Sequence, residues 1–280
     1  MYQILQKTQH SEKVFEYRVH APRIAKAAHA GQFLMVRVDG TGERVPFTFA
    51  NWNPEEGWIE FIFMVIGKTT KILSELNEGD YIQDITGPLG CPTEIKGDRV
   101  AVIGGGVGLA IAYPVARTLC AQGKKVHVIM GARTKDLLLL FEQFAALPLE
   151  GLHITTDDGS MGEKGVVTLP LKRLCETDAI DSVFCVGPVP MMKFSTLTAQ
   201  EHNIPIVASL NPIMVDGTGM CGCCRVEVGG ETKFACVDGP DFDATLVDWN
   251  DLRARQATYR PEEAESMKHY EEEEACACQR

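Results

Sequence analysis

Cysteine is concentrated in one short stretch of this chain. Four of its ten cysteines, Cys221, Cys223, Cys224 and Cys236, lie within sixteen residues of one another, beside a run of glycines. The N-terminal residues show neither the charged region nor the apolar region of a secretory signal peptide. Clustered cysteines without an export signal are typical of metal binding in a reducing compartment rather than of disulfides. We therefore expect a cytoplasmic protein with a metal site in this stretch.

A β-hairpin is predicted inside the cysteine-rich stretch. Arg225–Val228 and Glu231–Ala235 read as strands, and the two glycines between them are typical of a two-residue hairpin turn. In that register Cys236 lies opposite Cys223 and diagonal to Cys224. The hairpin thus returns Cys236 to the glycine-rich loop, whose backbone can curl around a small group and direct N–H groups at it.

The cysteine spacing predicts an iron–sulfur cluster. Plant-type [2Fe-2S] clusters are bound by Cys-x4-Cys-x2-Cys and a distant fourth cysteine. Here the spacing is Asp216-x4-Cys221-x2-Cys224, followed by Cys236, so a carboxylate stands where the first thiolate is expected. Aspartate is a harder iron ligand than cysteine, and we expect the cluster to form with an altered reduction potential. Spacing favours Cys224 but leaves Cys223 open as a ligand. Structural zinc, which usually takes two cysteine pairs, and a disulfide-bonded loop are the alternatives.

Composition limits the kinds of partner. The chain has 280 residues, 45% of them hydrophobic, and a net charge of −11 at pH 7. This length suits two domains with substantial cores. The negative charge argues against nucleic acid and against anionic membranes as partners. No apolar run is long enough to span a bilayer. We therefore expect neither a nucleic-acid-binding protein nor a membrane protein.

The first hundred residues are predicted to be mainly β. Strand-like segments occur at 14–19, 31–38, 58–66 and 81–85, with glycine and proline between them. Short strands at this spacing are typical of a small barrel. Residues 69–76 have helical periodicity, so a single helix is predicted among these strands.

Strands and helices then alternate strictly. The predicted strands are 99–103, 125–130, 152–156, 181–185 and 204–209, and the predicted helices are 110–122, 137–147, 169–175 and 190–201. Such alternation is typical of a doubly wound parallel sheet. Ligands bind at the carboxyl ends of the strands in such sheets.

Glycines follow the first of these strands and open a helix, at Gly104–Gly108. This context predicts a phosphate cradle at the helix N-terminus, although the pattern departs from Gly-x-Gly-x-x-Gly and a tight turn without a ligand is the alternative. Arg133, after the next strand, is a candidate for contact with a phosphate or an adenine ring. Cys185 and Gly187 would let a flat ring approach, unless Cys185 is an ordinary buried residue.

Seven short segments follow one another in the order typical of the ferredoxin–NADP reductase superfamily. They are Arg44–Ala50, Gly67–Thr70, Gly87–Gly90, Gly104–Gly108, Asp157–Ser160, Cys185–Pro188 and the cysteine-rich loop. Over roughly its first 250 residues the chain resembles this superfamily. It is most similar to the branch that holds the electron-transfer subunits of dihydroorotate dehydrogenase. Within that branch it resembles the small subunits of NADH-dependent reduced ferredoxin:NADP oxidoreductases, in which aspartate replaces the first cluster cysteine.

The resemblance implies an FAD site in the N-terminal part. Pro46, Phe47 and Thr48 would line the flavin ring, with Thr48 near the nitrogen that accepts hydride. The ribityl and pyrophosphate groups would be bound by Met64, Val65, Thr69 and Thr70. A helix that begins near Thr69 suits a pyrophosphate on independent grounds. The superfamily usually has Arg three residues before the Ser or Thr, whereas Arg44 stands four before Thr48, which turns its side chain to the other face of a strand.

The resemblance also implies a nicotinamide nucleotide site and a set of metal ligands. The nucleotide would be bound by Gly105, Gly106, Gly108, Arg133, Cys185, Gly187 and Met191, with Cys185 and Thr48 at the reacting rings. The cluster would be bound by Asp216, Cys221, Cys224 and Cys236. The resemblance implies NAD(H), and the sequence itself does not decide between NAD(H) and NADP(H).

The pairing of cofactors predicts the activity. Nicotinamide passes two electrons as hydride and a [2Fe-2S] cluster passes one, so a flavin must stand between them. By resemblance, the chain is an electron-transfer subunit that passes electrons between NAD(H) and a larger partner subunit with its own flavin and [4Fe-4S] clusters. That partner would serve ferredoxin in an electron-bifurcating enzyme. The alternatives are an electron-transfer subunit of dihydroorotate dehydrogenase, a stand-alone NAD(P)H reductase, and a non-catalytic docking subunit with a zinc loop.

Patterns and resemblance together predict four units. They are an FAD-binding antiparallel β barrel over 1–98, a doubly wound NAD(P)-binding α/β domain over 99–210, a [2Fe-2S]-binding loop and hairpin over 211–250, and an acidic C-terminal segment over 251–280. The last segment is rich in glutamate and is expected to be a solvated helix or a disordered end. Cys276 and Cys278 near its end form a lesser candidate for a metal or redox pair.

Overall fold

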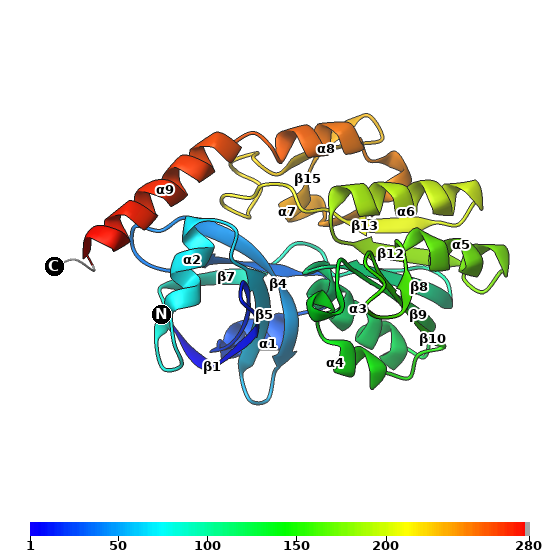
Figure 1. Cartoon of the computed structure of the whole chain (residues 1–280), viewed down its shortest axis with the longest axis horizontal. Coiled ribbons are helices and arrows are strands. Elements are labelled where there is room, and N and C mark those ends of the chain that lie inside the picture. The colour runs from blue at the N-terminus through cyan, green and yellow to red at the C-terminus, as the bar shows by residue number, and fades with distance from the viewer. Residues whose placement is uncertain (278–280) are drawn as a thin grey trace.

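Two seven-stranded sheets and one hairpin organise the molecule. The computed structural model describes residues 1–277, and the side chains as far as residue 273. Figure 1 shows the N-terminal sheet on the left and the second sheet on the right, with the hairpin and the last helices along the top.

The N-terminal sheet is antiparallel and curled. Its strands are β1 (Tyr2–Ser11), β2 (Val14–His20), β3 (Phe33–Arg37), β4 (Arg44–Asn53), β5 (Trp58–Met64), β6 (Tyr81–Ile82) and β7 (Asp84–Leu89), in the order β6-β1-β2-β5-β4-β3-β7. The strand predicted at 81–85 is split at Gln83, whose N–H donates to the Val38 carbonyl oxygen at 3.0 Å. Because only Gln83 separates the two edge strands, the sheet must curl back on itself, which confirms the predicted barrel.

Buried aromatic side chains fill the barrel. Tyr17, Phe49, Phe61 and Phe63 are almost fully enclosed. Two short helices pack on the barrel, α1 (Pro22–Ala27) and α2 (Lys68–Glu75). The Tyr17 hydroxyl donates to the Leu73 carbonyl oxygen at 2.6 Å and so holds the C-terminal half of α2 in place.

The second sheet is doubly wound, as predicted. Its strands are β8 (Arg99–Gly105), β9 (Lys125–Ala132), β10 (Gly151–Thr156), β11 (Glu163–Lys164), β12 (Ser182–Val186), β13 (Ile206–Ser209) and β16 (Asp241–Asp243), in the order β11-β10-β9-β8-β12-β13-β16. All neighbours are parallel except β13 and β16. Helices α3 (Gly108–Ala121) and α4 (Phe141–Ala145) cover one face, and α5 (Thr168–Glu176) and α6 (Val189–Glu201) cover the other.

One predicted helix is wrong in its extent. Instead of a helix over 137–147, the chain forms a 3-10 turn η1 (Lys135–Leu137) and the short helix α4. Between them Leu138, Leu139 and Leu140 are buried, and Leu140 has a left-handed φ of +57°. In a helix, three consecutive side chains point about 100° apart, so all three cannot face one core. The backbone therefore leaves the helical path to bury them.

The C-terminal part contains the predicted hairpin. Its strands are β14 (Arg225–Val228) and β15 (Glu231–Phe234), and the turn glycines have φ of +64° and +78°. The second strand stops at Phe234, because α7 (Ala235–Asp238) begins there and the Asp238 carboxylate accepts the Phe234 N–H at 2.7 Å. Cys236 is therefore helical, not paired across the ladder. The turn η2 (Ala244–Leu246) and helix α8 (Trp249–Arg255) follow.

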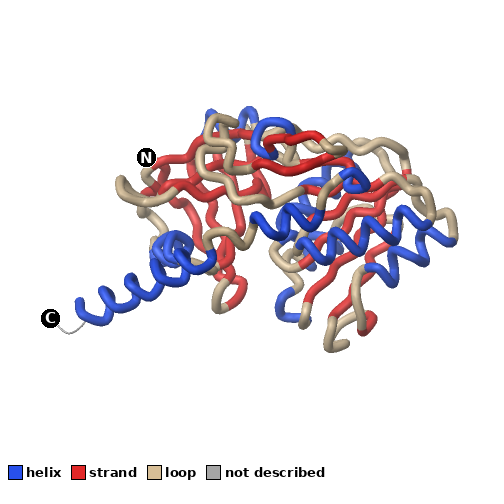
Figure 2. The backbone as a smooth tube through the Cα atoms, turned by 90° about the horizontal axis from the view of Figure 1, so that it is seen from above, coloured by secondary structure: helices blue, strands red, loops and turns tan. Residues whose placement is uncertain are grey.

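The acidic segment forms α9 (Arg260–Ala277), one of the two forms expected for it. Figure 2 shows this helix reaching away from the rest of the molecule toward the C-terminus. Its Tyr270 hydroxyl donates to Glu75 Oε2 on α2 at 2.9 Å. The side chain of Cys276 and all of Cys278 lie outside the described residues.

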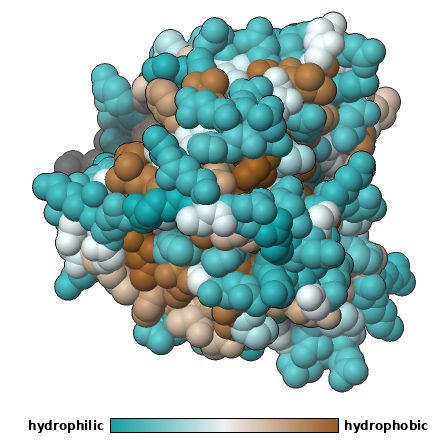
Figure 3. All heavy atoms as spheres, turned by 90° about the vertical axis from the view of Figure 1, so that its right-hand side faces the viewer, coloured by the Kyte–Doolittle hydropathy of each residue, from teal (hydrophilic) through white to brown (hydrophobic). Residues whose placement is uncertain are grey.

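The surface at the α/β end of the molecule is mainly hydrophilic, and hydrophilic side chains interrupt its hydrophobic ones (Figure 3). Within residues 1–277, none of the helices combines the length and the apolar character needed to cross a membrane.

Candidate functional site

A large cleft lies between the barrel and the carboxyl ends of the parallel strands, with a volume of about 1890 Å³. Sites for drug-sized ligands usually measure ~300–1,000 Å³, so this cleft has room for more than one such group. The predicted cofactor residues on its wall are Pro46, Phe47, Thr48, Met64, Thr69, Thr70, Gly105, Gly106, Gly108, Arg133, Gly187 and Met191. The fold thus brings together residues that are far apart in the sequence.

The barrel side of the cleft is a flat, largely apolar wall on β4. Pro46, Phe47 and Thr48 are half-buried, and β3 pairs with them from the side as an antiparallel neighbour in the sheet. The Phe47 ring stacks on Phe61, with centroids 5.2 Å apart and planes 4° from parallel. Because Phe61 is fully buried, the orientation of the Phe47 ring is set by the barrel core.

The N-terminus of α2 forms the polar end of this wall. The Thr70 hydroxyl accepts the Ile66 N–H at 3.0 Å and the Gly67 N–H at 3.2 Å, and it donates to the Gly67 carbonyl oxygen. Thr70 therefore shapes the start of the helix, whose first N–H groups favour an anion. Val65, predicted beside it, does not line the cleft and donates its N–H to Lys13.

Arg44 lies at the edge of the same cleft. It is exposed, and its Nη2 atom is 3.3 Å from Asp84 Oδ2 on β7, which lies beyond β3 in the sheet. The Arg44 guanidinium is thus paired with the Asp84 carboxylate. This agrees with the position of Arg44, which lies one residue away from the place of the usual arginine of the superfamily.

Close packing explains the glycines between β8 and α3. A Cβ atom at Gly105 would lie 2.3 Å from Met191 Sδ, and one at Gly108 would lie 2.6 Å from the Val186 carbonyl oxygen. Gly106 has a φ of +57° and open space beside it. The turn therefore presents bare backbone to the cleft at the beginning of α3, which suits a phosphate group.

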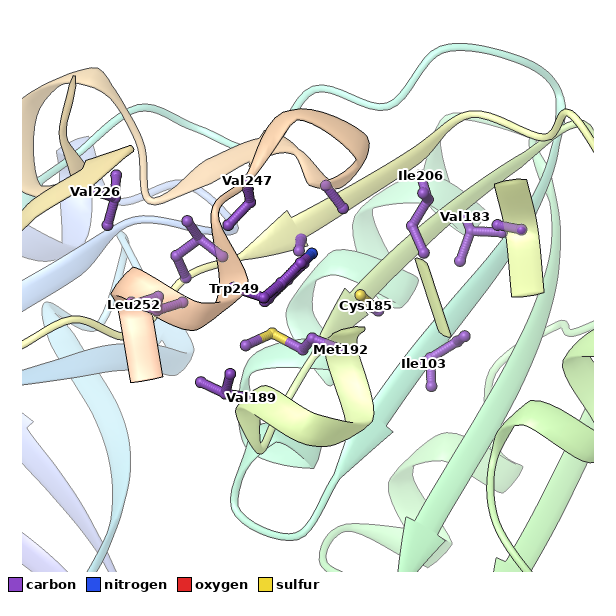
Figure 4. Close-up of a cluster of buried hydrophobic side chains, with 14 of the residues drawn as sticks. Ile103, Val183, Cys185, Val189, Met192, Ile206, Val226, Val247, Trp249 and Leu252 are labelled. Atoms are coloured by element: carbon purple, nitrogen blue, oxygen red, sulfur yellow. The ribbon is translucent and has the colours of Figure 1, made fainter. Parts of the chain in front are cut away.

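Cys185 does not reach the cleft. Its side chain is fully buried and lies near Met192, Ile103 and Trp249 (Figure 4). Burial, and then the charge of Asp241, raise the pKa of its thiol. The cysteine lies on the face of β12 that α5 and α6 cover, so its side chain points into the core. The expectation that Cys185 meets the nucleotide is corrected here, and Gly187 reaches the cleft in its place.

The predicted metal ligands gather at one loop and the hairpin beside it. The Sγ atoms of Cys224 and Cys236 are 3.2 Å apart and almost fully buried. Cys221 is exposed, and its Sγ accepts the Cys223 N–H at 3.5 Å. Asp216 accepts the N–H groups of Thr218 and Cys221, at 2.6 and 2.7 Å, and these hydrogen bonds lower the pKa of its carboxyl group.

The donor set suits an iron–sulfur cluster. Three thiols and one carboxylate of a single segment are soft and hard anionic ligands for iron. Among residues 1–273, no three His, Cys, Asp or Glu side chains already converge as a closed ion site. All eight described cysteines are free thiols.

The loop is pressed against the barrel beside the cleft wall. A Cβ atom at Gly217 would lie 2.6 Å from Met35 Cγ and 2.9 Å from Leu89 Cδ1. Met35 on β3 is the cross-strand partner of Pro46 on β4. Directly paired residues point to the same face of a sheet, so the metal-binding loop lies on the face that carries Pro46, beside the wall predicted for the flavin.

Other residues of the cleft had no signal in the sequence. Ser209 and Pro240 line it where β13 ends and β16 begins, and the exposed side chains of Phe194 and Tyr259 line it from α6 and from the residue before α9. An exposed aromatic residue on a helix becomes a candidate only when the fold shows which face is open.

Two family models match the chain. Residues 2–92 match the oxidoreductase FAD-binding domain, and residues 211–248 match the iron–sulfur cluster binding domain of dihydroorotate dehydrogenase B. The second range includes all four predicted metal ligands and favours an iron–sulfur cluster over zinc.

Two relatives cover most of the chain. The dihydroorotate dehydrogenase B (NAD(+)), electron transfer subunit homolog of Thermotoga maritima is 47% identical over 269 residues, which are 96% of this chain and 95% of the relative. The corresponding electron transfer subunit of Desulforamulus reducens is 34% identical over 238 residues, 82% of this chain and 90% of the relative.

Solved structures show the same fold. A chain in the structure of an NADH-dependent reduced ferredoxin-NADP oxidoreductase, described for its flavin-based electron bifurcation, superposes with a TM-score of 0.90. It is 46% identical, and the match covers 96% of this chain and 98% of that one. A ferredoxin NADP+ reductase of Neisseria gonorrhoeae, at 17% identity and a TM-score of 0.58 over 72% of this chain and 90% of that one, shares the fold alone.

Proposed function

The chain belongs to the family of electron-transfer subunits related to dihydroorotate dehydrogenase B, and on that premise we propose its place in a complex. It passes electrons between NAD(H) and a partner flavoprotein subunit, in an electron-bifurcating NADH-dependent reduced ferredoxin:NADP oxidoreductase. The matches to an FAD-binding domain and to an iron–sulfur cluster binding domain support the two cofactors. The similarity to a chain of the NADH-dependent reduced ferredoxin-NADP oxidoreductase, at 46% identity, supports the type of complex.

One observation carries this proposal: the contact of Gly217 with Met35, the cross-strand partner of Pro46. It brings the loop with the cluster ligands to the face of the sheet that carries Pro46, beside the cleft wall. A one-electron centre at the loop and a flat aromatic cofactor on the wall would then be neighbours. A zinc loop that only docks a partner would need no such contact.

The residues of the cleft have separate tasks in this proposal. Pro46, Phe47 and Thr48 hold a flat ring, and the N-terminus of α2 at Thr69 and Thr70 binds a pyrophosphate. The turn at the start of α3 binds the phosphates of the nicotinamide nucleotide. A bound flavin supplies the chemistry, because it exchanges electrons in pairs with nicotinamide and singly with a cluster.

We assign the cluster ligands as Asp216, Cys221, Cys224 and Cys236, with Cys223 outside the set. The closeness of the Cys224 and Cys236 sulfur atoms supports this choice. Asp216 already accepts the Cys221 N–H, so its carboxylate lies beside the first thiol of the set.

The partner in this proposal is a larger subunit with its own flavin and [4Fe-4S] clusters, which exchanges electrons with ferredoxin. Neither nucleic acid nor a membrane is a partner. Free thiols in the cysteine-rich loop support a reducing, cytoplasmic location. We propose the boundaries 1–98, 99–210, 211–250 and 251–280 for the barrel, the α/β domain, the cluster unit and the acidic segment.

A second candidate is an electron-transfer subunit of dihydroorotate dehydrogenase. Its support is the description of several relatives, among them the protein of Desulforamulus reducens. The aspartate at position 216 weighs against it, because that branch has cysteine there by the resemblance. A partner that carries a site for orotate, recovered with the tagged chain, would favour this candidate.

The test is a cofactor analysis of the chain purified without oxygen. We expect one flavin and two irons per chain, and a cluster that persists with a shifted potential in Asp216→Cys. Cys224→Ser should lose iron, whereas the matched variant Cys223→Ser should retain it. Zinc without iron, or a chain without flavin, would overturn the proposal.

A further inference from the structure

Asp241 lies where three parts of the molecule meet. It begins β16 directly after Gly239 and Pro240, and it pairs with Ser209 at the carboxyl end of β13. The Gly239 carbonyl oxygen accepts the N–H of Cys91 at 2.7 Å. Cys91 lies in the barrel linker, residues 90–98, which joins the barrel to the second sheet. Pro240 and Ser209 line the cleft, and α7, which carries a cluster ligand, ends just before this segment. The residue thus belongs to the cluster unit and lies next to two residues that line the cleft.

Asp241 is half-buried as a residue, but an oxygen of its carboxylate is shielded from solvent and lacks a partner. Thr93 Oγ1 donates to its Oδ2 atom at 2.5 Å, but Oδ1 is shielded from solvent and has no hydrogen-bond partner among the described residues. Burial raises the pKa of this carboxyl group to about 6, although the hydroxyls of Thr93 and Ser209 oppose the shift. A buried charge with one unpaired oxygen is unfavourable, and such groups cluster at functional sites.

The groups around Asp241 leave its charge uncompensated. No Lys or Arg of the described residues contributes to its pKa. The titratable group that feels its charge is the buried thiol of Cys185, whose pKa is raised first by burial and then by Asp241. Glu94 on the linker, Asp238 on α7 and Asp243 on β16 are exposed to solvent. The carboxylate can therefore gain a proton without breaking an ion pair.

We propose that Asp241 takes up one proton when the neighbouring cofactors gain an electron, and releases it when the electron leaves. The inference rests on the proposed function, because it needs flavin and cluster in place. The electron comes from the reductant, NAD(H) or a chemical one, and the proton comes from solvent to form an O–H bond at the carboxylate. The charge of the buried region is then unchanged.

Electrostatics gives the sign of the effect. An added negative charge nearby disfavours the ionised carboxylate, so reduction raises its affinity for a proton. By linkage, a proton on Asp241 favours reduction to the same extent. Below about pH 6 the oxidised protein already holds this proton, so reduction takes up none. Above that pH each electron draws in a proton, and reduction becomes harder as the pH rises.

The experiment is a redox titration of the cluster in the loaded chain, followed by electron paramagnetic resonance between pH 5 and pH 8.5. We expect the carboxyl group of Asp241 to bind a proton more tightly in the reduced state than in the oxidised state, so that reduction takes up a proton above pH 6. The potential should then fall by up to about 59 mV for each pH unit, the one-electron equivalent of a tenfold change. Asp241→Asn should remove this slope, and the matched variant Asp243→Asn on the same strand should keep it.

A second variant tests the same idea where Asp241→Asn fails to fold. Thr93→Val removes a hydrogen bond that favours the charged carboxylate, so the slope should begin at a higher pH. A slope that persists in Asp241→Asn, or a potential that is independent of pH in the unmodified chain, would overturn the inference alone. A chain that binds neither flavin nor iron would overturn the proposed function as well.

Discussion

Gly108 leaves no room for a side chain where α3 begins. A Cβ atom would lie 2.6 Å from the Val186 carbonyl oxygen, which belongs to the backbone of β12 and cannot swing aside. We expect Gly108→Ala to push the start of α3 away from the strand. It should lower the free energy of unfolding by roughly 1–3 kcal/mol and weaken NADH binding. Thermal unfolding and a titration with NADH measure the two effects.

Gly40→Ala is the matched control for this change. Nothing lies within 4 Å of a Cβ atom at Gly40, so both stability and NADH affinity should stay at the level of the unmodified chain. Unchanged NADH affinity in Gly108→Ala would show that the turn does not bind the nucleotide.

The raised pKa of Asp241 predicts how stability depends on pH. A carboxyl group with a pKa of 3.8 when unfolded and about 6 when folded stabilises the fold only while protonated. Its contribution is complete below pH 4 and is lost as the pH rises through 6. Asp241→Asn keeps an acceptor for Thr93 without the charge. It should therefore be more stable than the unmodified chain at pH 8, by up to about 3 kcal/mol, and equally stable near pH 4.

Chemical denaturation of both chains across this pH range measures the difference. Asp243→Asn, at an exposed site on the same strand, should track the unmodified chain. Equal stability of Asp241→Asn and the unmodified chain at pH 8 would mean that the buried carboxylate carries no such penalty.

At the scale of single residues, the sequence predicted positions better than orientations. The motif around Phe47 placed three residues along the cleft, of which Pro46 and Thr48 share one face of β4, whereas the Phe47 ring turns to Phe61 in the barrel. Cys185 was misplaced because the sequence does not show which face of a doubly buried strand meets the cleft. The role of Asp241 depends on Thr93 and Ser209, which only the tertiary fold brings to it.

The hairpin β14–β15 is the element that positions Cys236. Both turn residues have left-handed φ values, and the Gly229 N–H donates to the Leu246 carbonyl oxygen at 2.8 Å. A β-branched side chain at Gly229 would cost roughly 1–2 kcal/mol in this conformation. We expect Gly229→Val to loosen the hairpin and to speed the loss of iron during incubation with a chelator.

Gly229→Asn is the control for this element. It creates Asn-Gly, the pair that this type of turn prefers, and should hold iron as firmly as the unmodified chain. Equal iron loss from the Val and Asn variants would show that the turn conformation does not support the cluster site.

Elements with strong periodicity were predicted well, and elements defined by tertiary contacts were not. The parallel strands β8 and β12 consist mainly of consecutive apolar residues, which are typical of a buried sheet. Strand β16 has three residues and pairs with β13, from which more than thirty residues separate it. A local sequence pattern therefore does not predict it. The break at Leu140 arises because three leucines enter one core, which local helical periodicity does not show.

At the scale of the whole molecule, the fold joins distant segments into one path. The cysteine-rich loop contacts β3 on the face that β3 shares with Pro46, through Gly217 and Met35, and Val215 beside the loop lines the cleft. The segment at Gly239 is bonded to the barrel linker at Cys91, and β16 joins the second sheet. The cluster unit therefore contacts both sheets of the molecule.

Helix α9 begins at the cleft, passes α2 and then reaches away from the rest of the molecule (Figures 1 and 2). Glu262 and Ser266 of its first turns line the cleft, and Tyr270 bonds to Glu75 on α2. None of its side chains up to residue 273 is fully buried. We expect a chain truncated after Tyr259 to keep its unfolding temperature within a few degrees, because little apolar surface is lost. It should release flavin faster, because that side of the cleft is open.

Flavin fluorescence after rapid dilution measures the release rate. Tyr270→Phe removes the hydrogen bond to Glu75 and keeps the helix, so its release rate should lie between those of the full and truncated chains. If truncation leaves the rate unchanged, α9 does not cover the cofactor and its acidic surface serves another purpose. If truncation instead unfolds the barrel, the contact of α9 with α2 stabilises the fold more than its exposed surface indicates.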